Sequence, residues 1–131
     1  MCQCYRSRKV LKLRLIENGQ KRCVKNIVKK DLEILCISQI TLHGALKTNV
    51  LDFRKSMSAD SSKKLYQKSI YRLRSSYKPG ATKDGLFDAY TEYSVQNDGY
   101  VIYQLESPSK IASWRYCRLL VIEMCHGTTT P

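Results

Sequence analysis

The sequence predicts an α+β fold: a small single domain in which an antiparallel β-sheet, made of two hairpins and further strands, packs against one amphipathic helix. Two segments with turn residues at their centres and one segment with helical apolar spacing lead to this prediction. The chain has 131 residues, 43% of them hydrophobic and 26% charged, which suffices for one hydrophobic core. We therefore expect a single domain over residues 1–131, with residues 1–8 and 127–131 flexible.

The first hairpin is predicted around Asn18-Gly19, a pair of residues well suited to a type I′ turn. Before this turn, apolar and charged residues alternate over residues 10–16, which is the pattern of a half-buried strand. A two-residue loop would place Lys12 opposite Lys25, an unfavourable pair of like charges. Either the strands pair in another register, or a bound anion relieves this repulsion.

The middle of the chain predicts a buried strand followed by a connection. Residues 32–42 are rich in Leu and Ile and indicate a third strand, although residues 31–36 would also suit a short helix. Residues 44–57 have a mixed pattern, in which we expect one further short strand or turn at residues 50–53.

The helix is predicted to begin near residues 58–62, where several serines and an aspartate can serve as N-cap. Pro79 and Gly80 cannot continue it, so it should end at residue 77 or 78. The face that packs on the core is defined by apolar residues at helical spacing: Tyr66, Ile70, Leu73 and Tyr77.

The final third predicts the second hairpin and a last strand. Residues 86–95 and 100–106 flank a turn at residues 96–99, for which two registers remain open. Residues 114–124, with an apolar run at 119–122, predict the last strand.

Positive charge is concentrated in the first part of the chain. The formal net charge is +12, and residues 1–83 hold 20 of the 23 Lys and Arg residues but 5 of the 11 acids. This asymmetry indicates a surface for phosphates or anionic lipid, with simple solubility as the alternative. No apolar run approaches the roughly 20 residues that span a bilayer, and no secretory signal is evident. We therefore expect an intracellular protein, cytoplasmic or nuclear, with reduced thiols.

Motifs for catalysis and metal binding are sparse. The P-loop, dinucleotide-binding, metalloprotease and nucleophile-elbow patterns are absent, and His43 and His126 lack metal-ligand spacing. Cys2, Cys4, Cys125 and His126 are four groups that could meet at a metal, but their spacing is not that of a zinc site. We assign no catalytic residue, no cofactor and no metal, and we interpret the protein as non-catalytic.

Nucleic-acid binding is the function that the composition favours. Phosphate contacts need exposed Lys and Arg, and tyrosines supply stacking partners for unpaired bases. RNA is favoured over DNA because no recognition-helix motif is present and the predicted sheet is rich in tyrosine. The candidate residues lie on the first hairpin and on one face of the helix: Lys12, Arg14, Lys21, Arg22, Lys25, Lys64, Lys68 and Arg72.

Two alternatives concern the end of the chain and its overall character. Residues 92–106, "EYSVQNDGYVIYQLE", and residues 118–127, "RLLVIEMCHG", resemble the closing strands of the RelE/ParE superfamily of toxin ribonucleases. The resemblance implies a ribonuclease with His126 as the acid–base residue and Arg115 or Arg118 as a phosphate ligand. The other alternative is a small accessory or viral protein that acts through protein–protein contacts at exposed strand edges.

Overall fold

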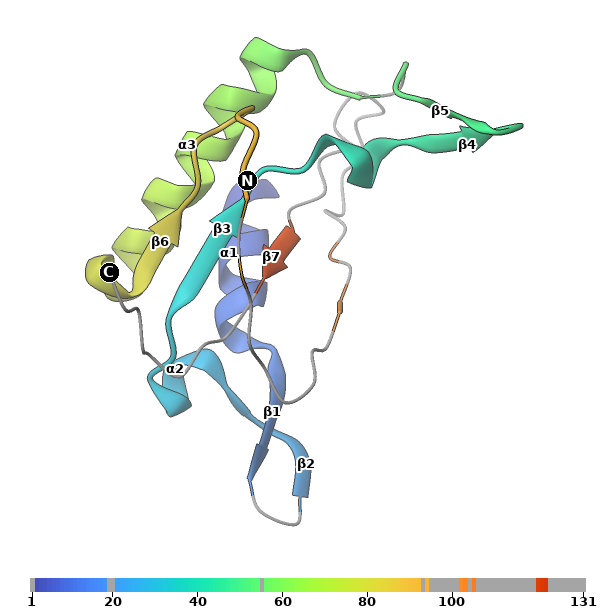
Figure 1. Ribbon diagram of the computed structural model, residues 1–131. Coiled ribbons are helices and arrows are strands. Elements are labelled where there is room, and N and C mark those ends of the chain that lie inside the picture. The colour runs from blue at the N-terminus through green and yellow to red at the C-terminus, as the bar shows by residue number, and fades with distance from the viewer. Residues whose placement is uncertain are drawn as a thin grey trace.

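The computed structural model describes residues 2–18, 21–54, 56–92, 94, 102, 103, 105 and 120–122 (Figure 1). Within these residues the strands form three small sheets. The α-helices are α1 (Cys2–Lys12), α2 (Ile27–Lys30) and α3 (Ala59–Ser76), and the 3-10 helices are η1 (Ile40–His43) and η2 (Pro79–Ala81). The strands are β1 (Arg14–Asn18), β2 (Lys21–Asn26), β3 (Ile34–Ile37), β4 (Ala45–Lys47), β5 (Val50–Asp52), β6 (Thr82–Asp84) and β7 (Leu120–Ile122).

The sheet that organises the fold has β3 at its centre, with β6 on one side and β7 on the other. β3 runs antiparallel to β7, with Cys36 opposite Val121, and parallel to β6, with Cys36 opposite Asp84. Parallel pairing requires a crossover between the two strands, and α3 provides it. The α+β class with antiparallel strands and a helix is confirmed, whereas the parallel pair is an addition to it.

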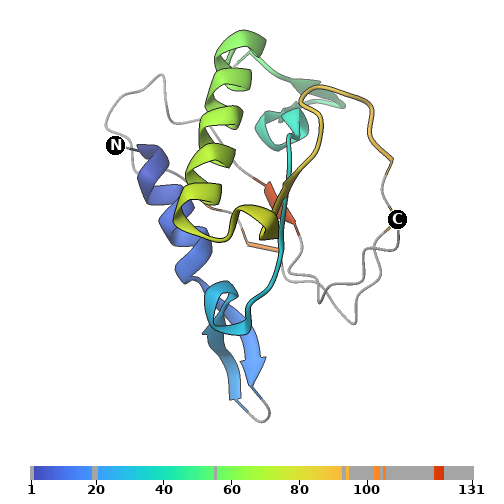
Figure 2. The same ribbon diagram turned by 90° about the vertical axis from the view of Figure 1, so that its left-hand side faces the viewer.

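α1 and α3 cover one face of this sheet, and the core lies between them and β3 (Figure 2). Ile34 and Cys36, alternate residues of β3, are buried. On α3, Tyr66, Ile70 and Leu73 are buried at the predicted spacing. The predicted helix is therefore confirmed in its position and in the face that it buries.

The start of the first predicted strand is instead the end of α1. Val10 and Leu11 are only 3% and 6% exposed, and Ser7, one turn earlier, is buried as well. Burial at positions i, i+3 and i+4 is typical of one face of a helix. The alternation of apolar and charged residues before residue 14 is too short to distinguish this helix from a strand. Residues 2–8, for which the sequence predicts flexibility, belong to the same helix.

The first hairpin is present, but its register differs from the predicted one. Asn18 pairs with Lys21 and Ile16 pairs with Lys25, with register shifts along the ladder. Lys12 lies in α1 rather than in the hairpin. The predicted Lys12–Lys25 pair is therefore wrong, and no bound anion is needed to explain it.

Three other predictions are corrected by the structure. β3 covers only part of the strand predicted at residues 32–42, because η1 begins at Ile40. The alternative helix at residues 31–36 does not form; α2 precedes it and ends at Lys30, with Asp31 as its C-cap at a φ of 54°. Residues 86–92 form turns and irregular backbone instead of a strand, and Asp88 has a φ of 60°, a left-handed conformation incompatible with a regular strand.

Two further predicted strands are present at least in part, whereas residues 102, 103 and 105, inside the strand predicted at residues 100–106, have no regular secondary structure. β5 confirms the strand predicted at residues 50–53, and it pairs with β4 in a hairpin. β7 lies inside the strand predicted at residues 114–124. The rest of that strand, the turn at residues 96–99 and the tail at residues 127–131 lie outside the described residues.

The prediction that no segment spans a membrane can be compared with the helices of the structure. In the part of the chain that the structure describes, no helix combines the length and the apolar character needed to cross a membrane.

Candidate active site

Two loops leave the central sheet at the same edge, because β3 and β6 are parallel. We call residues 38–44, which include η1, the β3 loop, and residues 85–92 the β6 loop. Open α/β sheets usually bind their ligands outside the carboxyl ends of parallel strands. This edge, called the carboxyl edge below, is therefore the first place to look for a functional site.

The β3 and β6 loops are hydrogen bonded to one another. The Gly85 N–H donates to the Cys36 carbonyl at 2.9 Å. Further out, the Asp88 N–H donates to Ser38 Oγ at 3.4 Å. Aspartate tolerates a positive φ better than most residues do, so Asp88 allows the chain to turn at the point where it meets Ser38.

The β3 loop brings short polar side chains to the surface. Gln39 and Thr41 are exposed, and Ser38 and His43 are half-buried. Gln39 Nε2 donates to Thr41 Oγ1 at 2.5 Å, so Thr41 keeps its own hydroxyl hydrogen to donate. Ser38 Oγ accepts from a backbone N–H in the same way. The loop therefore offers two hydroxyl donors at one edge of the sheet.

Two buried titratable groups lie near the end of β3, where the β3 loop begins. Tyr66 is 7% exposed, and burial raises the pKa of its phenol to about 12. Cys36 is fully buried, and burial raises the pKa of its thiol to about 11. Both side chains stay protonated at neutral pH, so neither supplies a thiolate or phenolate nucleophile.

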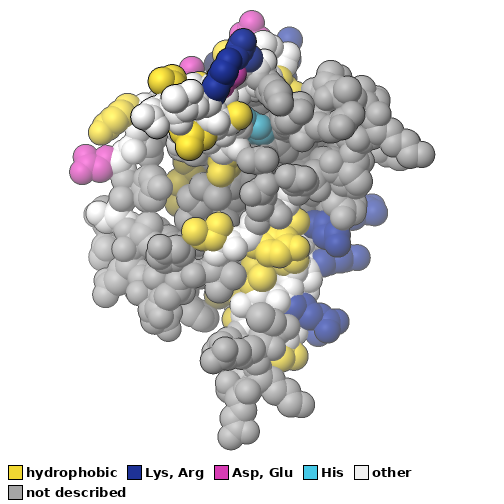
Figure 3. All heavy atoms as spheres, turned by 90° about the vertical axis from the view of Figure 1, so that its right-hand side faces the viewer, with side chains coloured by type: hydrophobic (Ala, Val, Ile, Leu, Met, Phe, Trp, Pro, Cys, Tyr) yellow, Lys and Arg dark blue, Asp and Glu magenta, His cyan; other side chains and the backbone are white. Residues whose placement is uncertain are grey.

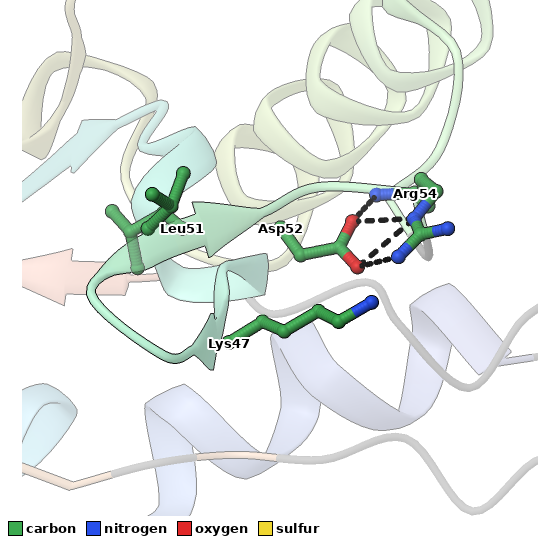
Figure 4. A pocket seen from close by; sticks show the side chains of 5 residues that line it. Lys47, Leu51, Asp52 and Arg54 are labelled. Atoms are coloured by element: carbon green, nitrogen blue, oxygen red, sulfur yellow. Dashed lines mark hydrogen bonds and ion pairs between the residues drawn. The ribbon is translucent and has the colours of Figure 1, made fainter.

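The β4–β5 hairpin continues directly from the β3 loop and carries a surface hollow of about 280 Å³ (Figure 4). The Arg54 guanidinium donates to the two carboxylate oxygens of Asp52 at 3.0 and 2.7 Å, and this hydrogen bonding raises the pKa of Arg54. Lys47 extends toward the same side, and Val50 and Leu51 complete the lining. Two cations and one acid leave the hollow with a net positive charge.

The predicted nucleic-acid-binding residues of the N-terminal part lie at the junction of α1 and the first hairpin. Lys12 ends α1 and Arg14 begins β1, and both are exposed. Lys25 is half-buried on β2. Lys21 and Arg22 also belong to β2, but their side chains lie outside what the structure describes. Figure 3 shows one face of the molecule, with Lys and Arg side chains along its right-hand margin and a separate group at the top.

The predicted residues of the helix lie on α3. Lys64 and Lys68 are exposed, whereas Arg72 is half-buried. Lys64 and Lys68 flank Tyr66, whose hydroxyl reaches the carboxyl edge. The two lysines therefore lie level with that edge along α3, but on the exposed side of the helix, whereas Tyr66 is buried. The predicted residues of the N-terminal part, called the hairpin group below, belong to the end of α1 and to β1 and β2, at the other end of the molecule (Figure 1).

The residues of the β3 loop are not among the predicted site residues. Ser38, Gln39 and Thr41 continue a segment rich in Leu and Ile that predicts a buried strand. The change from apolar to polar residues at Ser38-Gln39 is the one local signal of a boundary there. As for metals, no cluster of three His, Cys, Asp or Glu side chains occurs among the described residues, and Cys125 and His126 are not among them.

Polar loops at the carboxyl edge of parallel strands, on an α+β fold, are an arrangement that enzymes commonly use. Comparison with known families shows which family this chain resembles. The family model of D-Tyr-tRNA(Tyr) deacylase matches residues 4–106, most of the chain. The chain belongs to the D-Tyr-tRNA(Tyr) deacylase family.

Individual relatives agree with this family. D-aminoacyl-tRNA deacylase of Drosophila melanogaster is 42% identical over 81% of this chain and 67% of that protein. D-aminoacyl-tRNA deacylase 1 of Homo sapiens is 42% identical over 78% of this chain and 49% of that protein. A solved structure of the c-Myc DNA Unwinding Element Binding Protein has a TM-score of 0.75 and 40% identity, covering 82% of this chain and 72% of that chain. The chain spans about half of the length of the human relative.

Family membership corrects the functional interpretation of the sequence. The prediction of a non-catalytic nucleic-acid-binding protein is wrong, because the family and its relatives are deacylases. A basic surface indicates that a protein binds a polyanion, but it does not indicate whether the protein also catalyses a reaction of that polyanion.

The two alternative functions are also wrong. Residues 92–106, which carry the resemblance to RelE/ParE ribonucleases, lie inside the deacylase match. Alternating apolar strands around an Asn-Asp-Gly turn suit many β-hairpins, so this pattern does not separate the two families. The interpretation as an accessory or viral protein fails on the same family match.

Proposed function

We propose that this chain hydrolyses the ester bond between a D-amino acid and tRNA. The observation that carries the proposal is the match to the D-Tyr-tRNA(Tyr) deacylase family over residues 4–106. The names of the fly and human relatives support the same substrate class. Because the chain spans only part of the human relative, its own activity has to be measured.

The β3 loop is the part of the chain to which we assign the chemistry. Attack of water on the ester carbonyl produces a tetrahedral oxyanion, which hydrogen-bond donors must stabilise. Ser38 and Thr41 each have a hydroxyl hydrogen to donate, and Gln39 holds the Thr41 oxygen in place. The water oxygen forms the new bond to the acyl carbon as the bond to the ribose oxygen breaks. One proton of the water goes to the ribose oxygen and the other to solvent, so that the amino acid leaves as a carboxylate.

We assign the basic residues to the phosphates of the tRNA. Lys64 and Lys68, which lie level with the carboxyl edge along α3, suit the part of the RNA nearest to the ester. The hairpin group suits RNA further from it, because β1 and β2 extend from the opposite end of the molecule (Figure 1). The full set is Lys12, Arg14, Lys21, Arg22, Lys25, Lys64, Lys68 and Arg72.

The test is to incubate the purified chain with D-Tyr-tRNA and L-Tyr-tRNA and to follow release of tyrosine. We expect hydrolysis of D-Tyr-tRNA in preference to L-Tyr-tRNA. Loss of one oxyanion donor typically lowers kcat about 100-fold or more, and we expect a loss of this order for Ser38→Ala and Thr41→Val. Ser75→Ala is the matched control, because it removes an exposed hydroxyl near the end of α3, away from the carboxyl edge.

Two results would contradict this proposal in different ways. Failure of the folded chain to hydrolyse D-Tyr-tRNA would remove the proposed activity. Hydrolysis at the normal rate by both β3-loop variants would keep the activity but place the chemistry elsewhere.

A further inference from the structure

Tyr66 connects α3 to the beginnings of both loops at the carboxyl edge. Its hydroxyl lies 2.8 Å from the carbonyl oxygen of Cys36, near the end of β3. The same hydroxyl lies 3.1 Å from the carbonyl oxygen of Gly85, the first residue after β6. A phenol has one hydrogen to donate, so the two carbonyls share it, and the hydroxyl is positioned between the two strand ends.

The aromatic ring of Tyr66 makes a second contact with the β6 loop. Its centroid lies 5.6 Å from that of Phe87, with an interplanar angle of 46°, a favourable geometry for aromatic rings. Phe87 is followed by Asp88, whose N–H donates to Ser38 Oγ. One side chain on a long helix therefore contacts the backbone of β3 at Cys36, two residues before the β3 loop, and the backbone of the β6 loop at Gly85. Its ring also contacts Phe87, the residue before Asp88.

The strand ends do not depend on Tyr66 for all of their pairing. The Gly85 N–H donates to the Cys36 carbonyl at 2.9 Å without it. Removal of the phenolic oxygen leaves that hydrogen bond intact, but the Gly85 carbonyl loses its hydrogen bond from the Tyr66 hydroxyl. Such a change should loosen the start of the β6 loop more than it disturbs the sheet.

We propose that Tyr66 is a positioning residue for the deacylase reaction: its hydroxyl and ring hold the β3 and β6 loops in register, so that the Ser38 and Thr41 hydroxyls are aimed at the ester. The inference rests on the proposed function. Tyr66 does not touch the substrate in this arrangement; it acts through the backbone of the two loops.

Tyr66→Phe tests the hydroxyl, since it keeps the ring and deletes one oxygen atom. A small misplacement of catalytic groups costs about 10- to 100-fold in rate. We therefore expect kcat for D-Tyr-tRNA to fall by about that factor while KM changes little. Tyr71→Phe is the matched control, because Tyr71 is on the same helix and 73% exposed, and it should keep the normal kcat.

Amide hydrogen exchange supplies a readout that does not require activity. In Tyr66→Phe, the amides of the β3 and β6 loops should exchange faster, while those of α3 and β3 should exchange as in the unmodified protein. A normal kcat in Tyr66→Phe would overturn the proposal. Loop amides that exchange at the same rate in Tyr66→Phe as in the unmodified protein would overturn it as well. If the unmodified chain lacks deacylase activity, the proposed function fails, and exchange alone decides whether Tyr66 orders this edge.

Discussion

Asp31 combines a backbone turn with an ion pair. Its φ of 54° ends α2, and its carboxylate accepts hydrogen bonds from Lys78 Nζ at 2.7 Å and from the Tyr77 hydroxyl at 3.2 Å. The hydrogen bond from Lys78 is the main cause that lowers the pKa of Asp31. The same pair raises the pKa of Lys78. The end of α2 is thereby tied to the chain that follows α3.

The stability of the protein should fall in acid as Asp31 takes up a proton. A carboxyl group whose pKa is lower in the folded than in the unfolded state stabilises the fold above its unfolded pKa, and the effect is lost as pH falls through the folded pKa. Asp31→Asn removes the charge but keeps a residue that tolerates a positive φ. We expect this variant to have a lower Tm near neutral pH, with the difference shrinking as pH falls below the ordinary aspartate pKa of about 3.9 and disappearing below the lowered pKa of the folded protein.

Circular dichroism melting curves across this pH range measure the effect of Asp31. Glu92→Gln removes an exposed carboxylate elsewhere and serves as the control. The same Tm difference at neutral and at acid pH would show that the ion pair is not the source of the stabilisation.

The Cys36 thiol should be unreactive in the native protein. It is fully buried, burial raises its pKa to about 11, and alkylation requires the thiolate. We expect iodoacetamide at mildly alkaline pH to leave Cys36 unmodified in the folded chain and to modify it rapidly in denaturant, as mapped by peptide mass spectrometry. Equal rates in the two states would show that the core around β3 opens readily.

Among the elements, the β4–β5 hairpin depends on the absence of a side chain at Gly44. A Cβ at this position would lie 3.1 Å from Leu51 Cδ2, 3.1 Å from Phe53 Cε1 and 3.3 Å from the Thr41 carbonyl oxygen. The two side chains can move, but the carbonyl belongs to η1. The hairpin therefore packs closely against the β3 loop, so a shift of the hairpin should also move the backbone at Thr41.

Gly44→Ala should destabilise the protein by about 1 kcal/mol, because overpacking of this kind typically costs 1–3 kcal/mol and two of the three neighbours can adjust. Urea unfolding followed by circular dichroism measures the change. Gly80→Ala is the matched control, since a Cβ there meets nothing within 4 Å, and it should be neutral or slightly stabilising. If Gly44→Ala is no less stable than Gly80→Ala, the hairpin is not packed on the β3 loop as the structure shows.

The elements differ in how far their sequence determines them. α3 is predictable because its apolar spacing and its stop at Pro79-Gly80 are local features. β6 escapes prediction because its three residues become a strand only through parallel pairing with β3, across an intervening helix. Parallel pairing of distant segments leaves no local pattern in so short a strand.

The candidate active site is hidden for the same reason. Ser38 and Thr41 gain significance only because the end of β3 lies beside the end of β6. The basic residues are visible in composition, since Lys and Arg are mostly exposed in folded proteins. Charge could therefore be predicted from the sequence, whereas the geometry of the proposed active site could not.

At the scale of the whole molecule, the basic residues extend from the carboxyl edge to the opposite end of the domain. The carboxyl edge and the β4–β5 hairpin lie at one end, and the first hairpin extends from the other (Figure 1). Residues 1–83 hold 20 of the 23 Lys and Arg residues. A polyanion as long as tRNA can contact the whole length of such a domain, so its phosphate contacts and its ester can be far apart.

This separation predicts that salt affects KM for D-Tyr-tRNA but not kcat. Each phosphate contact adds about 0.7 to 0.9 to the slope of log affinity against log salt. Lys12→Gln/Arg14→Gln should therefore reduce that slope by roughly 1.5 and leave kcat unchanged, as should Lys64→Gln/Lys68→Gln if both groups bind RNA. Lys83→Gln removes an exposed charge from β6 and serves as the control. An unchanged slope in both double variants would show that the tRNA backbone follows another path.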